Sequence, residues 1–142
     1  MSATQQFCSF FLDDLFFGVE VEKVQEVIRH QETTRVPLAD SVIGGLINLR
    51  GQIVTALDLR KRLSLPVPKE GVTPMNVVVR GDDGAVSLLV DEIGDVVEVE
   101  ECQFELPPDT LRGAARELIR GAYKLSGRLL LLLDTDKAIR VS

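Results

Sequence analysis

The sequence predicts a mainly β protein, built as two small five-stranded β-barrels that share a hydrophobic core and carry a few short helices. The first observation is an internal repeat, because the segment GLINLRGQIVTALD from Gly45 returns as GAYKLSGRLLLLLD from Gly121. The second is a series of short apolar segments separated by tight turns. A soluble protein must cover the edges of such strands, and closing each sheet into a barrel does so. One repeat alone is too small to bury an adequate core, so we expect two lobes packed together.

The two copies of the repeat differ at one informative position. Arg50 precedes the turn glycine Gly51 in the first copy, whereas Ser126 precedes Gly127 in the second. The shared positions are Gly45, Leu49, Gly51, Leu57 and Asp58 in the first copy and Gly121, Leu125, Gly127, Leu133 and Asp134 in the second. The first copy therefore carries a permanent cation at the tip of an otherwise apolar hairpin.

The first third of the chain predicts two hairpins. Segments 7–12 and 15–19 are rich in aromatic and β-branched residues and flank the turn dipeptide Asp13-Asp14. A short helix from Glu20 to about Gln25 is expected next, feeding a strand. Segments 46–49 and 53–57 then form a second hairpin around Arg50-Gly51.

A short helix is expected after the second hairpin. Asp58 is a suitable N-cap, and Leu59 and Leu63 share one helix face. The basic run 60–62 is expected on the outer, solvated face, because three charges in an acidic chain are fewer than membrane or nucleic-acid contact requires. Pro66 and Pro68 end this helix.

The proline-rich segment 64–74 is the expected boundary between two halves, after which the pattern restarts. Strands are predicted at 75–79 and 85–90 around the turn 81–84, at 95–100, at 122–125 and at 128–133. Segment 109–118 fits a short helix or a loop, and Asp134 and Asp136 are expected to cap a terminal helix. We therefore expect one domain over 1–142, with lobes built roughly from 14–66 and 75–133 and terminal segments exchanged or packed across.

Composition excludes several classes of protein. The chain has 142 residues, 45% of them hydrophobic, and a net charge of −6, so it lacks the basic face that nucleic-acid binding needs. Two distant cysteines and a single histidine favour a reduced, metal-free, cofactor-free protein. The polar N-terminus predicts neither a signal peptide nor a membrane anchor, so a cytoplasmic location is expected.

Several motifs in order resemble the bacterial CheW-type chemotaxis coupling proteins. They are KVQEVI from Lys23, GLINLRGQIV from Gly45, ALDLRKRL from Ala56, LLVDEIGDVVEV from Leu88 and the GAYKLSGRLLLLLD segment. The resemblance covers nearly the whole chain and implies two SH3-like barrels. It also implies a non-enzymatic adaptor that joins chemoreceptor tips to the CheA-type histidine kinase, whose regulatory domain has the same fold, at membrane-associated receptor arrays. Thr55 and Ser87 depart from the family's usual proline and glycine, which puts the standard partner surfaces in question.

The resemblance also implies a set of partner-binding residues. Carried over by position, they are Val24, Glu26, Gly45, Asn48, Leu49, Arg50 and Gly51. Each has a structural alternative: Val24 fits the core, Glu26 fits solvent, and Gly45 and Gly51 fit turns that need positive φ. Arg50 is the strongest candidate, since its guanidinium binds carboxylates bidentately, and the alternative is a local salt bridge to Glu26 or another carboxylate.

Other functions find less support in the sequence. No nucleophile lies in a recognisable elbow or glycine-rich cradle, so we expect no catalytic residues. A small oligonucleotide-binding barrel would need aromatic stacking platforms, but aromatic residues are 5% of the chain and tryptophan is absent. A CheW-like adaptor of a pilus-motility or another chemosensory-like pathway stays open, because sequence does not separate these systems.

Overall fold

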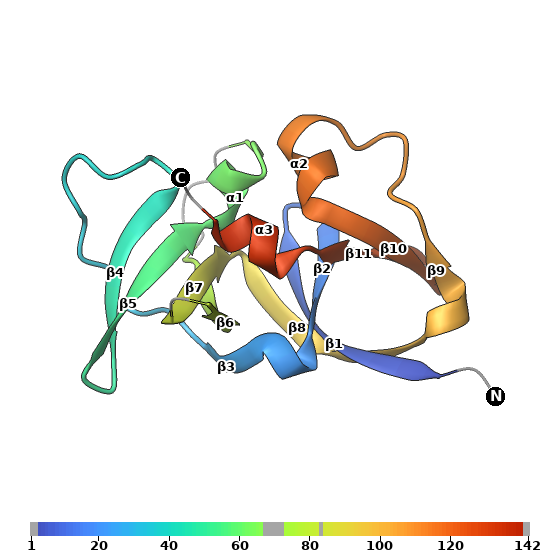
Figure 1. Cartoon of the computed structure of the whole chain (residues 1–142), viewed down its shortest axis with the longest axis horizontal. Coiled ribbons are helices and arrows are strands. Elements are labelled where there is room, and N and C mark those ends of the chain that lie inside the picture. The colour runs from blue at the N-terminus through green and yellow to red at the C-terminus, as the bar shows by residue number, and fades with distance from the viewer. Residues whose placement is uncertain (1–2, 67–72, 83, 141–142) are drawn as a thin grey trace.

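Two antiparallel-rich sheets form the protein in a computed structural model that describes residues 3–66, 73–82 and 84–140 (Figure 1). The six-stranded sheet has the order β8-β1-β2-β11-β10-β9, and the five-stranded sheet has the order β3-β6-β7-β5-β4. The strands of the first sheet are β1 (Thr4–Leu12), β2 (Leu15–Glu20), β8 (Glu92–Glu100), β9 (Phe104–Glu105), β10 (Ile119–Leu125) and β11 (Arg128–Leu133). Those of the second are β3 (Val24–Ile28), β4 (Ile43–Leu49), β5 (Gln52–Asp58), β6 (Met75–Gly81) and β7 (Gly84–Val90). The mainly β architecture is confirmed.

The two halves of the chain exchange their first hairpins. The β1–β2 hairpin lies between β8 and β11, and the β6–β7 hairpin lies between β3 and β5. Relative to lobes built from 14–66 and 75–133, each sheet therefore contains a hairpin from the other half. On one side, each exchanged hairpin joins its sheet through a parallel strand pair. Phe17 of β2 pairs with Leu131 of β11, and Val86 of β7 pairs with Thr55 of β5. This exchange ties the lobes together covalently as well as by packing.

The internal repeat corresponds to repeated local geometry. Both copies contain a register irregularity next to their first glycine, between Ile43 and Gly45 in β4 and between Ile119 and Gly121 in β10. A carboxylate then caps a short helix in each copy. The Asp58 Oδ1 accepts a hydrogen bond from the Lys61 amide at 3.2 Å, and the Asp134 Oδ1 accepts one from the Lys137 amide at 3.1 Å.

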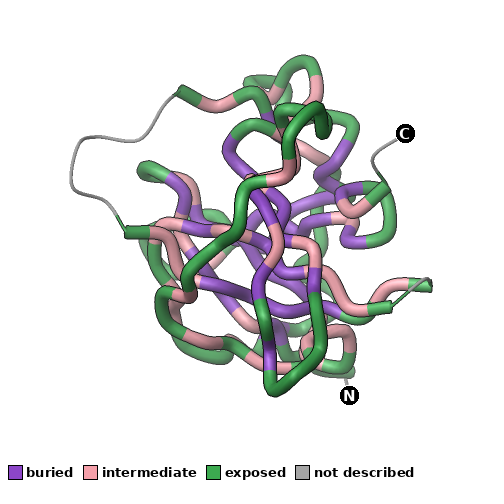
Figure 2. Tube along the Cα trace, turned by 90° about the vertical axis from the view of Figure 1, so that its left-hand side faces the viewer, coloured by how far each residue is buried: buried purple, intermediate pink, exposed green. Residues whose placement is uncertain are grey.

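Three hydrophobic clusters make up the core. A central cluster between the sheets includes Phe10, Phe17, Leu57, Leu88 and Leu133, all nearly inaccessible to solvent. Each lobe also has its own interior, one around Phe7, Tyr123 and Leu130 and the other around Ile47, Val54 and Val78. In Figure 2 the buried stretches of the chain lie inside the molecule, and the exposed stretches follow loops and hairpin tips. A core shared between two lobes is therefore present, as the sequence predicts.

The helices are short, and one differs from expectation. The helix expected from Glu20 to Gln25 is only the single 3₁₀ turn η1 (Val21–Lys23), because Val24 already pairs with Val79 in the sheet. The segment 109–118 contains α2 (Gly113–Leu118). The other helices are α1 (Leu59–Arg62), η2 (Glu101–Gln103) and α3 (Thr135–Ile139). No helix in the described ranges has the length and apolar character needed to cross a bilayer. Pro68 and the turn residue Asp83 lie outside the described residues.

The expectation that residues 60–62 form a solvated face is wrong for Arg60. The Arg60 side chain is only 8% exposed and forms ion pairs with Asp13 and Asp91. Its Nε donates to Asp91 Oδ1 at 2.8 Å, and its Nη1 donates to the Pro66 carbonyl at 2.7 Å. The sequence pattern missed this because both acids are distant in the chain and are brought to α1 by the β1–β2 turn and the end of β7.

The contacts between Arg60 and Asp91 favour the charged forms of these two side chains. The hydrogen bond from Arg60 to Asp91 is the main reason that the pKa of Arg60 is raised. Burial by itself would raise the pKa of Asp91, but hydrogen bonds from Arg60 and the Asp13 amide, together with the Arg60 charge, lower it below its usual value. We call Arg60, Asp13 and Asp91 the α1 ion cluster.

Candidate functional site

The tip of the β4–β5 hairpin holds the arginine that the sequence singles out. Leu49 pairs with Gln52 across a two-residue turn in which Arg50 has φ 55° and Gly51 has φ 86°. Two positive φ values are typical of a type I′ hairpin turn, which matches the twist of the strands. The Asn48 Oδ1 accepts a hydrogen bond from the Gly51 amide at 2.9 Å, which fixes the turn. A non-glycine residue in this conformation is strained, so Arg50 stands out at the tip.

Arg50 is held by Glu26 of β3, the strand at the opposite edge of the same sheet. Its Nη1 donates to Glu26 Oε2 at 3.0 Å, so the alternative of a local salt bridge to Glu26 is what the structure shows. The Arg50 side chain remains 80% exposed, whereas that of Glu26 is 16% exposed. An ion pair with so exposed a partner contributes little to stability. Its effect is to orient a guanidinium whose other N–H groups face solvent and can bind a carboxylate.

Val24 and Leu49 occupy structural positions. Val24 is half-buried and packs against the central cluster. Leu49 is buried in the interior of the lobe formed by the five-stranded sheet. Neither side chain lies on the open surface with Arg50. The structural alternative given for Val24 therefore describes its observed place.

Gly45 is required by a close backbone approach. It has φ 144°, and a Cβ built on it would lie 2.6 Å from the Thr34 carbonyl oxygen. Thr34 exchanges two 2.8 Å backbone hydrogen bonds with Leu46 and so covers the free edge of β4. Gly121 also permits a close approach in the other lobe, where a Cβ would collide with Phe104 and Glu105 of β9. The repeated glycine admits a covering segment in both lobes.

One candidate contact residue was missed by the sequence reasoning. Ile53 is 61% exposed and lies directly opposite Asn48 in the hairpin register. An apolar side chain thus lies beside the Arg50 turn and points away from the buried Val54. The exposure of Ile53 can be predicted from strand alternation, because successive side chains face opposite sides and Val54 faces inward. The site that the structure brings together consists of Glu26, Asn48, Arg50, Gly51 and Ile53, which we call the hairpin-tip site.

Ser87, a departure from the family pattern, lies inside the barrel. Its Oγ donates to Asn76 Oδ1 at 2.8 Å, and Asn76 Nδ2 donates to the Arg29 carbonyl at 3.2 Å. Both side chains are fully buried, and these bonds satisfy their polar groups. Ser87 therefore leaves the outer surface of the lobe unchanged.

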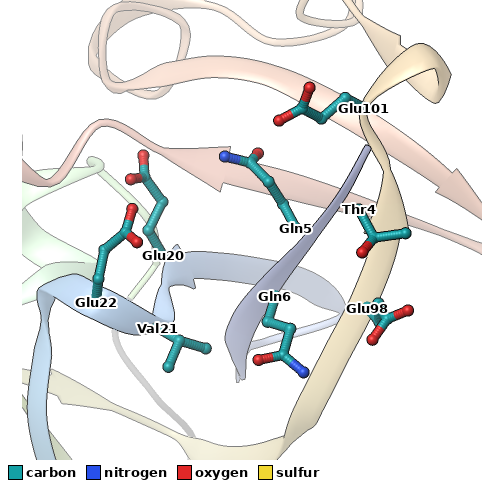
Figure 3. A pocket seen from close by; sticks show the side chains of 8 residues that line it. All are labelled: Thr4, Gln5, Gln6, Glu20, Val21, Glu22, Glu98 and Glu101. Atoms are coloured by element: carbon teal, nitrogen blue, oxygen red, sulfur yellow. The ribbon is translucent and has the colours of Figure 1, made fainter. Parts of the chain in front are cut away.

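A separate hollow of about 580 Å³ lies between the start of β1, η1 and the end of β8. Figure 3 shows its lining, in which the carboxylates of Glu20 and Glu22 point to the same side and those of Glu98 and Glu101 lie farther along. Burial and the hydrogen bond to Glu22 raise the pKa of Glu20. Within residues 3–66, 73–82 and 84–140, no three acidic, cysteine or histidine side chains are placed to hold a metal ion.

Comparison with known proteins gives concordant similarities. The CheW-like domain family matches residues 6–142. "Chemotaxis protein CheW" of Bacillus subtilis is 31% identical over 130 residues, covering 92% of this chain and 83% of the relative. The CheW of Thermotoga maritima is 30% identical over 131 residues, covering 92% and 85%. "Protein FrzA" of Myxococcus xanthus is 32% identical over 141 residues, covering 97% and 87%.

The fold agrees with a solved structure. The crystal structure of scaffolding protein TtCheW from Thermoanaerobacter tengcongensis superposes with a TM-score of 0.86 at 24% sequence identity, covering 99% of this chain and 95% of that one. This likeness confirms the fold of two SH3-like β-barrels. Taken with the family match over 6–142, it shows that this chain belongs to the CheW-like domain family.

Proposed function

We propose that the protein is a non-enzymatic adaptor that couples chemoreceptors to a CheA-type histidine kinase in bacterial chemosensory signalling. Membership of the CheW-like family and the chemotaxis names of the relatives support this role. The observation that carries the proposal is the hairpin-tip site, where an exposed Arg50 is held in place by Glu26 beside the exposed Ile53. A fixed cation next to an apolar side chain is suited to binding a protein partner that carries a carboxylate.

Two partners can be bound because the lobes differ. The hairpin of one lobe presents Arg50, whereas the hairpin of the other presents Ser126 at the equivalent position. We assign one face of the protein to the kinase regulatory domain and a second face, where the two barrels meet, to the helical tip of the receptor. The whole chain, 1–142, acts as one domain in this proposal, in the cytoplasm and recruited to membrane-associated receptor arrays, without cofactor or nucleic acid.

The test is binding by the purified full chain. Calorimetry measures the affinity of the chain for the kinase regulatory domain and for a receptor tip fragment. Arg50→Ala should lower the affinity for at least one of the two partners by about 10-fold. Lys124→Ala is the matched control, because Lys124 is an exposed cation on the corresponding hairpin of the other lobe. Unaltered affinity of Arg50→Ala for both partners would refute the assignment of this site. Absence of binding by the unsubstituted chain would refute the adaptor role.

A related pathway is a second candidate, because the similarity to FrzA extends over 97% of the chain. In that case the partners would be the receptor and kinase of another chemosensory-like or pilus-motility system. Co-purification from the native cytoplasm, with identification of the retained proteins, distinguishes the two. Retention of a flagellar chemotaxis kinase supports the first candidate, and retention of a kinase from another system supports the second.

A further inference from the structure

Leu38 is held in an unfavourable backbone conformation while its side chain is fully exposed to solvent. It has φ 64° and a relative exposure of 105%. A branched L-residue rarely adopts positive φ, because its Cβ crowds the backbone. The other non-glycine residues at positive φ in the described ranges are Asp13 and Arg50, which close hairpins, and Ser64, which follows α1. Among these four residues, Leu38 is the large apolar one, and its side chain is fully exposed.

The turn that carries Leu38 explains its backbone. The Ala39 amide donates to the Val36 carbonyl at 3.4 Å, and Pro37 occupies the second position with its φ fixed by the ring. This is the arrangement of a type II turn, whose third position favours glycine or asparagine. A leucine there is costly to the fold, and its fully exposed side chain gains little within the protein to offset that cost.

The loop is also held firmly on both sides of this turn. Thr34 is joined to Leu46 by two backbone hydrogen bonds of 2.8 Å. After the turn, the Ile43 amide donates to the Asp40 carbonyl at 2.8 Å. Leu38 therefore projects from a loop that is already ordered. Binding of a partner at Leu38 then costs little conformational entropy of this loop.

The surroundings of Leu38 are basic and concave. A hollow of about 740 Å³ lies beside this loop, and its lining includes Arg35 and Lys61 together with Asp40. Two cations and one carboxylate flank the exposed leucine. A complementary surface would have an apolar pocket for Leu38 and carboxylates at its rim.

We propose that Leu38 is an anchor that inserts into an apolar, acid-rimmed pocket of the kinase regulatory domain. This inference rests on the proposed function and deepens it. A projecting side chain needs a concave partner, which a globular barrel domain offers. A helical receptor tip, by contrast, is itself the segment that enters a groove. The geometry therefore favours the kinase over the receptor.

The experiment compares Leu38→Ala and Leu38→Gly in the full chain. Both variants remove the anchor, so calorimetric titration should show affinity for the kinase regulatory domain falling by about 10-fold or more. Leu106→Ala, at a leucine that is 80% exposed and also adjoins a proline, is the control and should bind normally. Only glycine relieves the backbone strain, so Leu38→Gly should melt about 2–4 °C above Leu38→Ala.

The possible outcomes separate this inference from the function on which it rests. Unchanged kinase affinity of both variants overturns the inference, even where Arg50→Ala confirms the hairpin-tip site. Weaker binding to the receptor fragment alone assigns Leu38 to the receptor and also overturns it. If the unsubstituted chain has no affinity for the kinase domain, the proposed function fails and this inference fails with it.

Discussion

Replacing Arg60 by methionine tests whether the α1 ion cluster stabilises the fold. Methionine keeps an apolar stem of similar length and removes only the charge and its donors. Removing one partner of a fully buried ion pair typically costs about 3–5 kcal/mol, because the remaining charge is left uncompensated. Here the Asp91 side chain is 19% exposed and that of Asp13 is 40% exposed, so water recovers part of the loss. We expect a cost of about 2–3 kcal/mol, or about 5–10 °C in melting temperature.

Urea unfolding followed by circular dichroism measures this cost. Lys61→Met is the matched control, since Lys61 is the exposed neighbour on the same helix, and its cost should stay within about 0.5 kcal/mol. Arg60→Met combined with Asp91→Asn should cost less than the sum of the two single changes, because both remove one interaction. Equal stability of Arg60→Met and Lys61→Met would refute the reasoning.

The pH dependence gives a second check on the same cluster. The pKa of Asp91 is lower in the folded state than its unfolded value of about 3.9. Its contribution is therefore complete above the unfolded pKa and is lost as the pH falls through the folded pKa. The stability difference between the unsubstituted chain and Asp91→Asn should be constant near neutral pH and shrink below about pH 4. A difference that persists unchanged in strong acid would contradict this assignment.

Two further predictions concern the repeated geometry. Gly45→Ala should destabilise by about 2–4 kcal/mol, because its Cβ would collide with the Thr34 carbonyl, whereas Gly51→Ala, with open space around the added Cβ, should cost about 1 kcal/mol in urea unfolding. Similar losses for both glycines would show that the close approach is unimportant. Asp58→Ala and Asp134→Ala each remove an equivalent N-cap, so thermal melts should show costs of about 1 kcal/mol for each, and a clear inequality would argue against equivalent caps.

Local signals predicted much of the fold. The turn at Asp13-Asp14, the turn at Arg50-Gly51 and the caps at Asp58 and Asp134 depend on neighbours within a few residues, and all are found in the structure. The helix at Glu20–Gln25 was wrong because pairing of Val24 with a distant strand outweighs helical spacing. The short strand β9 and η2 were not predicted, since two or three residues carry too little periodicity.

The candidate site was predicted only in part. Arg50 and Glu26 were both named from the sequence, but their ion pair forms because two edges of one sheet approach each other. Val24 and Leu49 were named with them and pack inward, and the exposed Ile53 was not named. Position in a motif does not say which face of a strand a side chain occupies once bulges shift the register.

The order of residues alone determined the doubled architecture, the family and the arginine at the hairpin tip, because repeats, turns and caps are read from adjacent residues. Tertiary structure decided the hairpin exchange between sheets, the burial of Arg60 and the exposure of Leu38. These features depend on which distant segments meet. The free energy that selects them comes from burying a core shared by both lobes, and no local segment contains that information.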